Sequence, residues 1–444
     1  MNRIKVQGSN EMRNMKQIFL LLTAALLLGA CNTKKTAEQT EEALRYVTVK
    51  NGEFYLGDKP YRFVGTNFWY GPILASEGRG GDTLRLKREL DTMQELGIDN
   101  LRVLVGGDGR DHLPSHISPV LQTAPGVYND TLLRGLDRFL YELEKRNMRC
   151  VLYLNNAWEW SGGYGSYLEW AGAGQAPIPS VDGWPAYMSY VQQFLQNEEA
   201  MTMSLQHVQN IVLRKNTITG KEYKFSPAIM SWQIANEPRA FSEENKPRLK
   251  EFISKTAKLI HTLDRQHLVS TGTEGMHGCE EDLELFTEIH ALPEIDYANI
   301  HIWPYNWGWI TKDNVAENVD SACWKTAEYI NLHYAQMYAL GKPITLEEFG
   351  YPRDGFSFTP GSPATGREKY YKYVFDIVVN SNKIAGCNFW GWAGYAQPRH
   401  IAWQEGDDYT GDPAQEEQGL NSVFMADKSV LNVVKQANET LKQK

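Results

Sequence analysis

Short apolar runs alternate with longer amphipathic stretches along most of the chain. Eight of the apolar runs have the length and the flanking residues of buried strands; they cover 62–68, 100–105, 149–154, 229–235, 268–273, 297–302, 343–347 and 387–390. Between them, apolar residues recur with helical spacing over 84–97, 131–147 and 248–264. Strands that alternate with helices in this way predict a parallel α/β fold.

The number of strands favours one particular α/β architecture. Eight strands with helices between them, and no repeated dinucleotide-binding glycine fingerprint, predict a (β/α)8 TIM barrel, with a doubly wound sheet as the alternative. About 75 residues separate the third strand from the fourth, with a glycine-rich loop at 161–174 and a helix beginning near Trp184. Insertions of this size usually shape a cleft. Because no linker follows residue 45, residues 46–444 are predicted to form a single domain.

The N-terminus has the pattern of an export signal. Lys16 precedes an apolar run at 18–30, which is too short for an ordinary membrane-spanning helix. LLGAC at 27–31 resembles a bacterial lipobox, in which Cys31 becomes the lipidated first residue. We therefore expect residues 1–31 to be a signal peptide and residues 32–45 a flexible tether to a membrane of the cell envelope. A cleaved secretory signal with an incidental cysteine is the alternative.

Charge and aromatic content narrow the class of ligand. The net charge of −9, without a basic stripe, argues against nucleic acid as a partner. The 13 tryptophans and 23 tyrosines exceed what a core needs, and many stand in polar stretches such as 156–170 and 301–309. Flat rings beside polar groups suit the faces of sugars. Core packing explains part of this aromatic content, and the remainder points to a carbohydrate ligand.

Cysteines and acidic residues give no clear sign of a metal or cofactor. Beyond residue 31, Cys150 and Cys387 begin strand-like runs and are expected to be buried thiols, whereas a disulfide between Cys279 and Cys323 stays open. No cysteine and histidine spacing indicates zinc. The acidic stretch at 405–412 is either a solvated loop or a calcium site. We expect no metal and no cofactor.

Polar and aromatic residues gather at the ends of the predicted strands. In a barrel, the carboxyl ends of all strands open on the same face, so these side chains should converge on one site. They are Asn67, Trp69, Arg102, Asn155, Asn156, Asn236, Glu237, His301, Trp303, Glu348, Trp390 and Trp392.

Two of these residues are carboxylates on different strands. A facing pair of carboxylates is what glycoside hydrolysis requires, one to protonate the leaving oxygen and one to attack the anomeric carbon or activate water. Pro238 follows Glu237 and is expected to hold it in extended geometry at the end of its strand. Strand alternation alone does not choose between Glu347 and Glu348.

The motifs at these strand ends resemble those of glycoside hydrolase family 5, a retaining family within a clan of (β/α)8 enzymes. The resemblance spans nearly the whole chain after residue 45, and the segments look most like the endo-β-1,4-mannanase branch found in polysaccharide-degrading Bacteroidetes. It is carried by FVGTNFWY (63–70), NLRVL (100–104), WQIANEPR (232–239), LEEFG (346–350) and NFW (388–390), and 409–424 looks like the last loop of that branch.

The resemblance implies roles for the charged and amide side chains. Glu237 corresponds to the acid/base. Glu348, which directly precedes the aromatic–glycine pair, corresponds to the nucleophile, and Glu347 does not. Arg102 resembles the arginine that orients the nucleophile. Asn236 resembles the asparagine that binds the sugar 2-hydroxyl.

The resemblance also implies a cleft lined by aromatic side chains. Trp69 takes the position of the cleft-lining residue of the first strand. Trp390 takes the position of the tryptophan beneath the sugar at the cleavage point. Three further tryptophans are expected to extend the cleft: Trp158, Trp160 and Trp307.

One motif departs from the family pattern. The sixth strand of the family usually carries His-x-Tyr, with the tyrosine hydroxyl near the nucleophile, whereas this chain has His301 and then Trp303. An indole N–H donates a hydrogen bond but cannot accept one. We expect a donor to the nucleophile to remain, with substrate preference more affected than the reaction.

These features together predict a monomeric, retaining endo-β-1,4-mannanase acting on β-mannan, glucomannan or galactomannan. Retention requires the two carboxyl groups to lie about 5–5.5 Å apart. A β-1,4-glucanase of the same family would share the catalytic frame. A surface lipoprotein that binds glycans without cleaving them is the alternative from another class.

Overall fold

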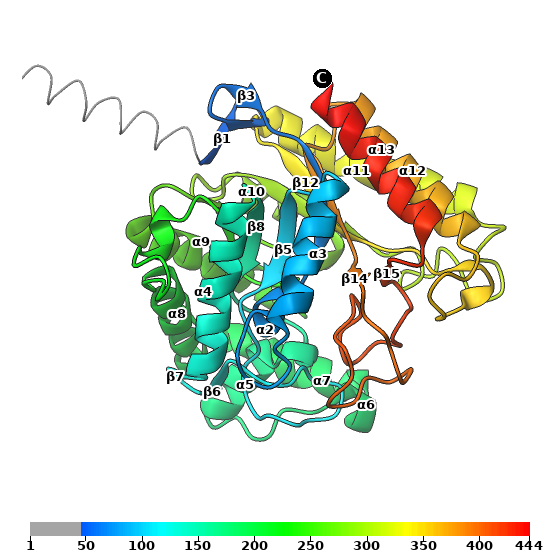
Figure 1. Ribbon diagram of the computed structural model, residues 1–444. Helices are drawn as coiled ribbons and strands as arrows, with labels where there is room; N and C mark the ends of the chain where they lie inside the picture. The colour runs from blue at the N-terminus through cyan, green and yellow to red at the C-terminus, as the bar shows by residue number, and fades with distance from the viewer. Residues whose placement is uncertain (1–45) are drawn as a thin grey trace, which may run out of the picture.

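The computed structural model describes residues 46–444, so the predicted signal, lipobox cysteine and tether lie outside the described residues. The centre of the fold is an eight-stranded sheet with the order β10-β9-β8-β5-β4-β13-β12-β11, in which each neighbouring pair is parallel (Figure 1). Its strands are β4 (Phe63–Asn67), β5 (Asn100–Leu104), β8 (Arg149–Tyr153), β9 (Ile229–Gln233), β10 (Leu268–Ser270), β11 (Ala298–Ile302), β12 (Ile344–Phe349) and β13 (Gly386–Phe389). All eight predicted strands are confirmed, and the fold is a (β/α)8 TIM barrel.

The barrel closes between β10 and β11 with few backbone hydrogen bonds. The backbone N–H of Asp296 donates to the carbonyl of Val269 at 2.9 Å. The side chain of Asn299 accepts from the N–H of Gly272 at 2.9 Å and donates to the carbonyl of Thr273 at 2.8 Å. A buried amide side chain therefore replaces part of the backbone ladder at this seam, because it satisfies backbone groups that would otherwise be unpaired.

Amphipathic helices surround the sheet. The predicted segments at 84–97, 131–147 and 248–264 form α3 (Thr83–Glu95), α4 (Asp130–Lys145) and α9 (Lys246–Leu263). The Asp82 side chain accepts from the backbone N–H of Arg85 to cap α3, and Asn129 caps α4 in the same way. The outer layer also contains α2 (Gly71–Leu74), α10 (Leu283–His290), α11 (Val319–Leu340), α12 (Thr365–Asn380) and α13 (Lys428–Lys442).

A small antiparallel sheet, not anticipated from the sequence, covers the N-terminal end of the barrel. It consists of β1 (Val47–Lys50), β2 (Glu53–Leu56) and β3 (Lys59–Pro60). Phe54 packs against the Tyr297 ring at 5.1 Å between centroids, within a buried cluster that includes residues of β4, β8 and β9. Figure 1 shows this sheet at the end of the barrel opposite the helices formed by residues 163–191. Since one end is sealed, a substrate site must lie at the other.

The long insertion between β8 and β9 is mainly helical. It contains α5 (Gly163–Trp170), α6 (Pro179–Asp182), α7 (Trp184–Val191) and α8 (Glu198–Val212), with short 3-10 turns at Glu159–Ser161, Gln192–Gln196 and Tyr223–Phe225. The helix expected near Trp184 is confirmed. The loop expected at 161–174 is wrong for most of its length, because residues 163–170 form the helix α5. Tyr164 and Tyr167 of this helix are buried, and the Tyr164 ring stacks on Phe194 at 3.9 Å between centroids. Tertiary packing of these aromatic rings overrides the low helix propensity of glycine.

The remaining elements lie in the connecting loops. A hairpin of β6 (Gln122–Ala124) and β7 (Val127–Tyr128) follows β5, and 3-10 turns occur at Glu243–Asn245, His277–Cys279 and Asp354–Phe356. β14 (Trp392–Gly394) pairs with β15 (Val423–Phe424). Between them runs a stretch, residues 395–422, that we call the C-terminal loop. It returns to the same end of the barrel as the helical insertion (Figure 1).

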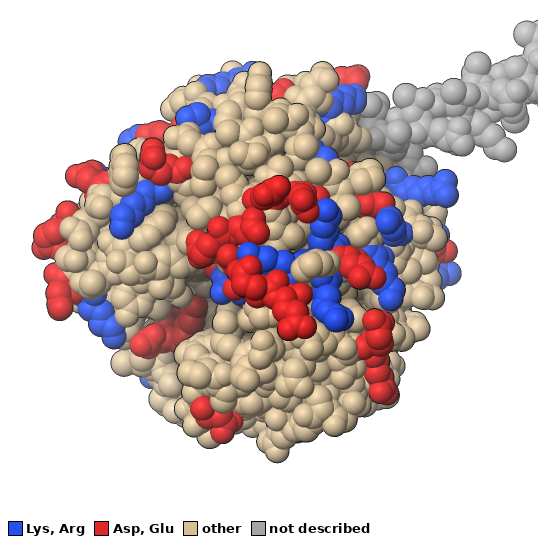
Figure 2. Space-filling model, turned by 180° about the vertical axis from the view of Figure 1, so that it is seen from behind, with Lys and Arg blue, Asp and Glu red and all other residues tan. Residues whose placement is uncertain are grey.

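All four cysteines of the described part are buried free thiols, so Cys279 and Cys323 do not form a disulfide. Burial raises the pKa of the Cys279 thiol and that of Cys323, which keeps both in the unreactive protonated form. Acidic and basic side chains mix within a band across the face seen in Figure 2, so this face has no field of a single sign. No helix within residues 46–444 has the length and apolar character needed to cross a membrane.

Candidate active site

The predicted strand-end residues converge at the end of the barrel away from the β1–β3 sheet. A cavity of about 710 Å³ opens there, and six of the predicted site residues line it: Trp158, Asn236, Glu237, Trp303, Glu348 and Trp390. The tryptophans expected to extend the cleft, Trp160 and Trp307, line it as well. Arg102 and His301 are fully buried beneath the lining residues. Carboxylates, amides and aromatic rings in one concave site match the composition of a carbohydrate-binding cavity.

A β-bulge in β12 decides which of the consecutive glutamates reaches the cavity. Ile300 of β11 pairs with Leu346, but the next residue, His301, pairs with Glu348, so Glu347 is the extra residue. The bulge lets both glutamates face the barrel interior. Glu347 lies deeper and accepts hydrogen bonds from Tyr297, Thr345 and Gln233, which satisfy its buried oxygens as a structural carboxylate requires.

Arg102 of β5 holds Glu348 in position. Its guanidinium donates to Glu348, to the Asn236 side chain at 2.8 Å, to Gln233 at 2.8 Å and to Asn67 at 3.2 Å. The planar fork of donors on arginine makes these simultaneous contacts possible, and lysine could not reproduce them. Arg102 thus fixes the nucleophile candidate and the neighbouring asparagine in one network.

Glu237 stands in an unusual backbone conformation at the end of β9. Its φ is 48°, in the left-handed region, so the extended geometry expected from Pro238 is wrong. The segment is held from both sides, because the N–H of Asn236 donates to the carbonyl of Asn155 at 2.7 Å and the N–H of Glu237 donates to the carbonyl of Gly272 at 2.9 Å. Strain of this kind persists only where the surroundings impose it, and it is common at active sites.

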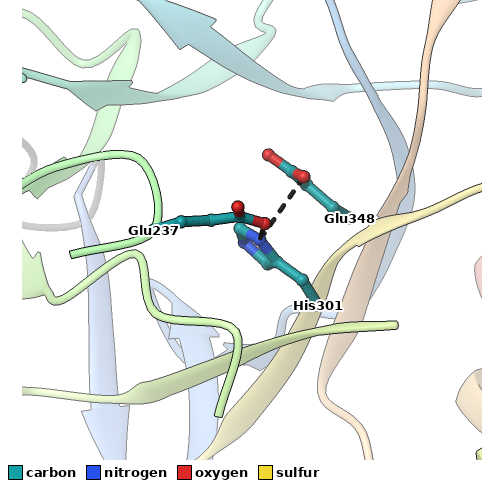
Figure 3. A group of neighbouring side chains, drawn as sticks. All are labelled: Glu237, His301 and Glu348. Atoms are coloured by element: carbon teal, nitrogen blue, oxygen red, sulfur yellow. Dashed lines mark hydrogen bonds and ion pairs between the residues drawn. The ribbon is translucent and has the colours of Figure 1, made fainter. Parts of the chain in front are cut away.

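The Glu237 carboxylate receives hydrogen bonds from uncharged ring N–H groups. One of its oxygens lies 2.7 Å from His301 Nδ1, and the other accepts from the Trp158 indole. The indole of Trp303 lies close enough to Glu237 to lower the pKa of its carboxyl. Trp303 of the His-x-Trp motif therefore acts on Glu237. The sequence led us to expect it beside the nucleophile candidate, Glu348. Figure 3 shows Glu237 and Glu348 approaching each other beside the His301 ring, whose Nδ1 lies 3.4 Å from Glu348.

Burial and charge determine the protonation of this pair. Burial raises the pKa of Glu237, partly offset by the Arg239 charge and the Trp158 hydrogen bond. Burial also raises the pKa of Glu348, against the opposing effect of Arg102. Two close carboxylates resist double ionisation. Only Glu348 is bonded directly to a guanidinium, and this contact favours the ionised form of Glu348. Burial and Arg102 lower the pKa of His301, which keeps its imidazole neutral.

Glu237, His301 and Glu348 offer the only grouping within residues 46–444 with metal-ligand geometry. One donor atom from each lies within 4.8 Å of the others. However, Arg102 is bonded to Glu348, and its positive charge opposes a divalent cation. The indole N–H of Trp158 likewise occupies a lone pair of Glu237. The donor set therefore fits a pair of acid–base carboxylates better than a metal centre.

The acidic stretch at 405–412 does not have the donor arrangement of a calcium site. Glu405 pairs with Arg79, Asp407 accepts from the backbone N–H of Gln404, and Asp408 accepts from that of Gln397. Asp412 accepts from three backbone N–H groups of residues 419–422. Calcium requires converging oxygen ligands, whereas these carboxylates are occupied by nitrogen donors.

Like Arg102 and His301, the predicted binding residue Trp69 does not line the cavity. Its side chain is buried, donates from Nε1 to the carbonyl of Gly411 at 3.1 Å, and packs edge-on against Trp160 at 5.9 Å between centroids. Trp160 in turn lies 6.4 Å from Trp390. Trp69 therefore supports a wall of the cavity from behind.

Several lining residues were not predicted. Arg239 pairs with Glu274, which follows β10, and burial beside Glu237 raises the pKa of Glu274 to about 7. The strand-end pattern contained a signal for Glu274, because it lies just beyond the fifth predicted strand. Gln415 and Glu416 line the cavity from the C-terminal loop, where no local pattern marked them.

Comparisons with known proteins agree with this geometry. A family model described as GH family 5 beta-mannosidase-like matches residues 44–444. Mannan endo-1,4-beta-mannosidase 1 of Arabidopsis thaliana is 29% identical over 330 residues, which cover 70% of this chain and 71% of the relative. Mannan endo-1,4-beta-mannosidase 5 of Solanum lycopersicum is 25% identical over 386 residues, which cover 84% of this chain and 87% of the relative.

Solved structures give the same result. A glycoside hydrolase family 5 mannosidase from Rhizomucor miehei has a TM-score of 0.82 at 29% identity, over 90% of this chain and 98% of that chain. The endo-1,4-beta-mannanase from the same organism has a TM-score of 0.64 at 21% identity, over 90% of this chain and 100% of that chain, a likeness that concerns the fold alone. Because the family model spans nearly the whole chain, this protein belongs to glycoside hydrolase family 5, in the group described as β-mannosidase-like.

Proposed function

We propose that this glycoside hydrolase cleaves β-1,4-mannosidic bonds with retention of configuration. The observation that carries the proposal is the pair of buried carboxylates, with one oxygen of Glu237 and one of Glu348 within 4.8 Å of each other. A gap of about 5–5.5 Å between carboxyl groups is typical of retaining enzymes, whereas inverting enzymes leave room for a water molecule at about 6.5–9.5 Å.

Each carboxylate is suited to one role. Glu348, held ionised by Arg102, attacks the anomeric carbon while the bond to the leaving oxygen breaks. Glu237, in its protonated form, gives a proton to that oxygen. A water molecule then attacks the same carbon, its proton passes to Glu237, and the ester bond to Glu348 breaks. Both residues return to their starting forms, so no cofactor is consumed.

The substrate class is supported by the relatives. The curated relatives are named mannan endo-1,4-beta-mannosidases, and the R. miehei mannosidase was solved with mannosyl-fructose. These names support β-mannan, glucomannan or galactomannan, and the plant names support cleavage within the chain. A β-1,4-glucanase would use the same carboxylates. Release of reducing ends from carboxymethyl cellulose, with none from mannan or glucomannan, would favour the glucanase.

The direct test of mechanism is the stereochemistry of the first product. We expect NMR of a manno-oligosaccharide digest to show the β-anomer before mutarotation. We expect Glu348→Gln and Glu237→Gln to fold normally and to lose almost all turnover, while Glu417→Gln, a neighbouring carboxylate outside the cavity lining, keeps it. The α-anomer as first product would contradict retention. A folded wild-type protein that binds mannan but releases no sugar would support the non-catalytic alternative.

The cellular location is a second part of the proposal. Cys31 in the LLGAC motif supports a lipid anchor in the bacterial cell envelope, and this residue lies outside the described part of the chain. Labelled fatty acid should enter the full-length protein expressed in a bacterium and should not enter Cys31→Ala. Equal labelling of both proteins would contradict the anchor, and release of unlabelled protein into the medium would support a cleaved secretory signal.

A further inference from the structure

The outer surface of α11 differs from that of α9. On α11, Trp324 and Tyr338 are 62% and 74% exposed, and the helix has no Asp, Glu, Lys or Arg between residues 329 and 340. By contrast, α9 exposes Arg248, Glu251 and Lys255. A surface helix usually presents charged groups to solvent, so large rings that recur on its exposed face indicate a binding surface.

The exposed rings of α11 share one side of the helix with an amide. Trp324, Asn331 and Tyr338 follow each other at intervals of seven residues, which places them on nearly the same side, about 10 Å apart along the axis. We call these three residues the α11 stripe. The half-buried Tyr334 ring lies 5.7 Å from that of Tyr338. The stripe therefore offers apolar rings at both ends and a hydrogen-bonding side chain between them.

A groove of about 390 Å³ runs beside the stripe, between α11 and α12, which lie side by side (Figure 1). Its polar and aromatic lining residues are Asn331, Tyr373, Asp376, Asn380, Ser381 and Lys383. The single acidic and the single basic residue balance each other in charge, so the groove does not select an anionic or a cationic partner. Rings beside amides and hydroxyls instead suit a neutral chain of sugars.

The stripe is connected to the mouth of the catalytic cavity. Exposed Asn306 and half-buried Trp307 line the cavity there, and the Trp307 ring lies 5.1 Å from that of Trp309 in the loop after β11. The ammonium group of Lys325 on α11 lies 5.7 Å from the centre of the Trp309 ring. Trp324, the next residue back along the chain, begins the stripe. A polymer longer than the cavity can therefore leave it over Trp309 and reach the stripe.

Resting on the proposed function for the class of sugar, we propose that the α11 stripe and the α11–α12 groove form a second binding site for a neutral β-mannan chain, outside the catalytic cavity. Trp324 and Tyr338 pack against the apolar faces of sugar rings, and the amides of Asn331 and Asn380 hydrogen-bond to hydroxyl groups. A polymer bound at this site has a raised effective concentration at the cavity. An oligosaccharide too short to span both sites gains nothing from it.

Rates on a polymer and on an oligosaccharide separate this site from the cavity. Trp324→Ala and Tyr338→Ala should each lower kcat/KM on glucomannan by about twofold to tenfold, as expected for the loss of one stacking ring. The double variant should keep the wild-type Tm and the wild-type rate on mannotetraose. Phe225→Ala, which removes an exposed ring from the loop before β9, is the matched control and should equal the wild type on both substrates. An unchanged rate of the double variant on glucomannan, or an equal loss on mannotetraose, would overturn the proposal.

Binding without turnover gives a second measurement. In the Glu348→Gln protein, electrophoresis through a native gel that contains glucomannan should show weaker retention when Trp324→Ala and Tyr338→Ala are added. Trp324→Phe with Tyr338→Phe, which keeps a ring at each position, should preserve most of the retention. Unchanged retention of the alanine variant would overturn the proposal.

Two further outcomes separate the second site from its rivals. A wild-type dimer that the alanine variant fails to form would show that a second copy of the chain covers the stripe, and would overturn the proposal. If the wild type releases no product from mannotetraose or glucomannan, while its retention still depends on Trp324 and Tyr338, the proposed function fails and the second site stands.

Discussion

The ends of β9 and β12 present the same residue type to the same cavity in opposite environments. Glu348, at the end of β12, is bonded to the buried guanidinium of Arg102. Glu237, beyond the end of β9, is bonded by the uncharged rings of His301 and Trp158. A full positive charge stabilises an ionised carboxylate far more than a neutral N–H does, so the bonded neighbours favour the proposed roles of nucleophile for Glu348 and acid for Glu237, with the Arg239 charge partly offsetting the difference at Glu237.

The backbones at these two positions differ as well. Glu348 stays within a paired strand and reaches the cavity through a bulge, whereas Glu237 lies in the left-handed region beyond its strand. Each device re-aims one side chain without moving the barrel. The comparison teaches that position in the fold brings the two carboxylates together, while their hydrogen-bond donors favour a different proposed role for each.

Glu237 and Glu348 should differ most on a substrate whose leaving group does not need to be protonated. Glu348→Ala should abolish turnover of both mannobiose and a 2,4-dinitrophenyl β-mannoside. Glu237→Ala should lose about 10²–10⁴-fold on mannobiose, but should still form the mannosyl–enzyme from the activated substrate, since that leaving group requires no proton. Stopped-flow measurement of the dinitrophenolate burst checks this. Equal loss of the burst in both variants would contradict the assignment of roles.

The second prediction concerns the guanidinium of Arg102, which is bonded to Glu348. Arg102→Lys keeps a positive charge but cannot contact Glu348, Gln233 and Asn236 together, so kcat/KM should fall by about 10²–10³-fold, as for loss of a preorganised electrostatic contact. Arg102 lowers the pKa of Glu348. Weakening that effect raises the pKa, so the acidic limb of the kcat/KM profile should move to higher pH. An unchanged acidic limb would show that Arg102 acts on structure alone.

The third prediction concerns Trp158, an uncharged donor bonded to Glu237. The Trp158 hydrogen bond lowers the pKa of Glu237, so Trp158→Phe should raise that pKa and move the basic limb of the profile to higher pH. We expect a loss of about tenfold or somewhat more in kcat/KM for natural substrates. Trp184→Phe is the matched control, because Trp184 packs edge-on against Trp158 but has no bond to Glu237. A shift of the acidic limb instead would indicate that Glu237 is the nucleophile and Glu348 the acid.

The smallest effect should separate the two consecutive glutamates of β12. Glu347 accepts hydrogen bonds from Tyr297, Thr345 and Gln233, so Glu347→Gln turns an amide N–H₂ towards donors and should cost about 1–3 kcal/mol of stability. Glu348→Gln relieves repulsion from Glu237 and should leave the Tm equal or higher. Thermal unfolding of the two variants checks this, and a larger loss in Glu348→Gln would exchange their roles.

The sequence predicts the barrel and most of the cavity because both depend on repeated patterns. Apolar runs locate all eight strands, and a barrel necessarily brings their ends together. The same patterns do not reveal the bulge that turns Glu347 and Glu348 to one side, since alternation with a period of two places neighbours on opposite faces. The conformation of Glu237 also escapes prediction, because tertiary hydrogen bonds override the preference imposed by Pro238.

Other features depend on contacts between distant segments. Trp69 leaves the cavity because Trp160, from the insertion, packs in front of it. The 161–174 segment becomes helical because its tyrosines find a buried partner in Phe194. Glu416 enters the cavity only because the C-terminal loop folds back across the barrel. The local sequence predicts none of these outcomes, because each depends on contacts between loops that are far apart along the chain.

The β1–β3 sheet has a consequence for how the molecule is oriented when held by its N-terminus. Residue 46 enters the fold at the sealed end of the barrel, and the catalytic cavity opens at the far end (Figure 1). If the chain is attached to a surface through residues ahead of 46, the sealed end of the barrel faces that surface. The cavity then opens away from it, where a long polymer can approach.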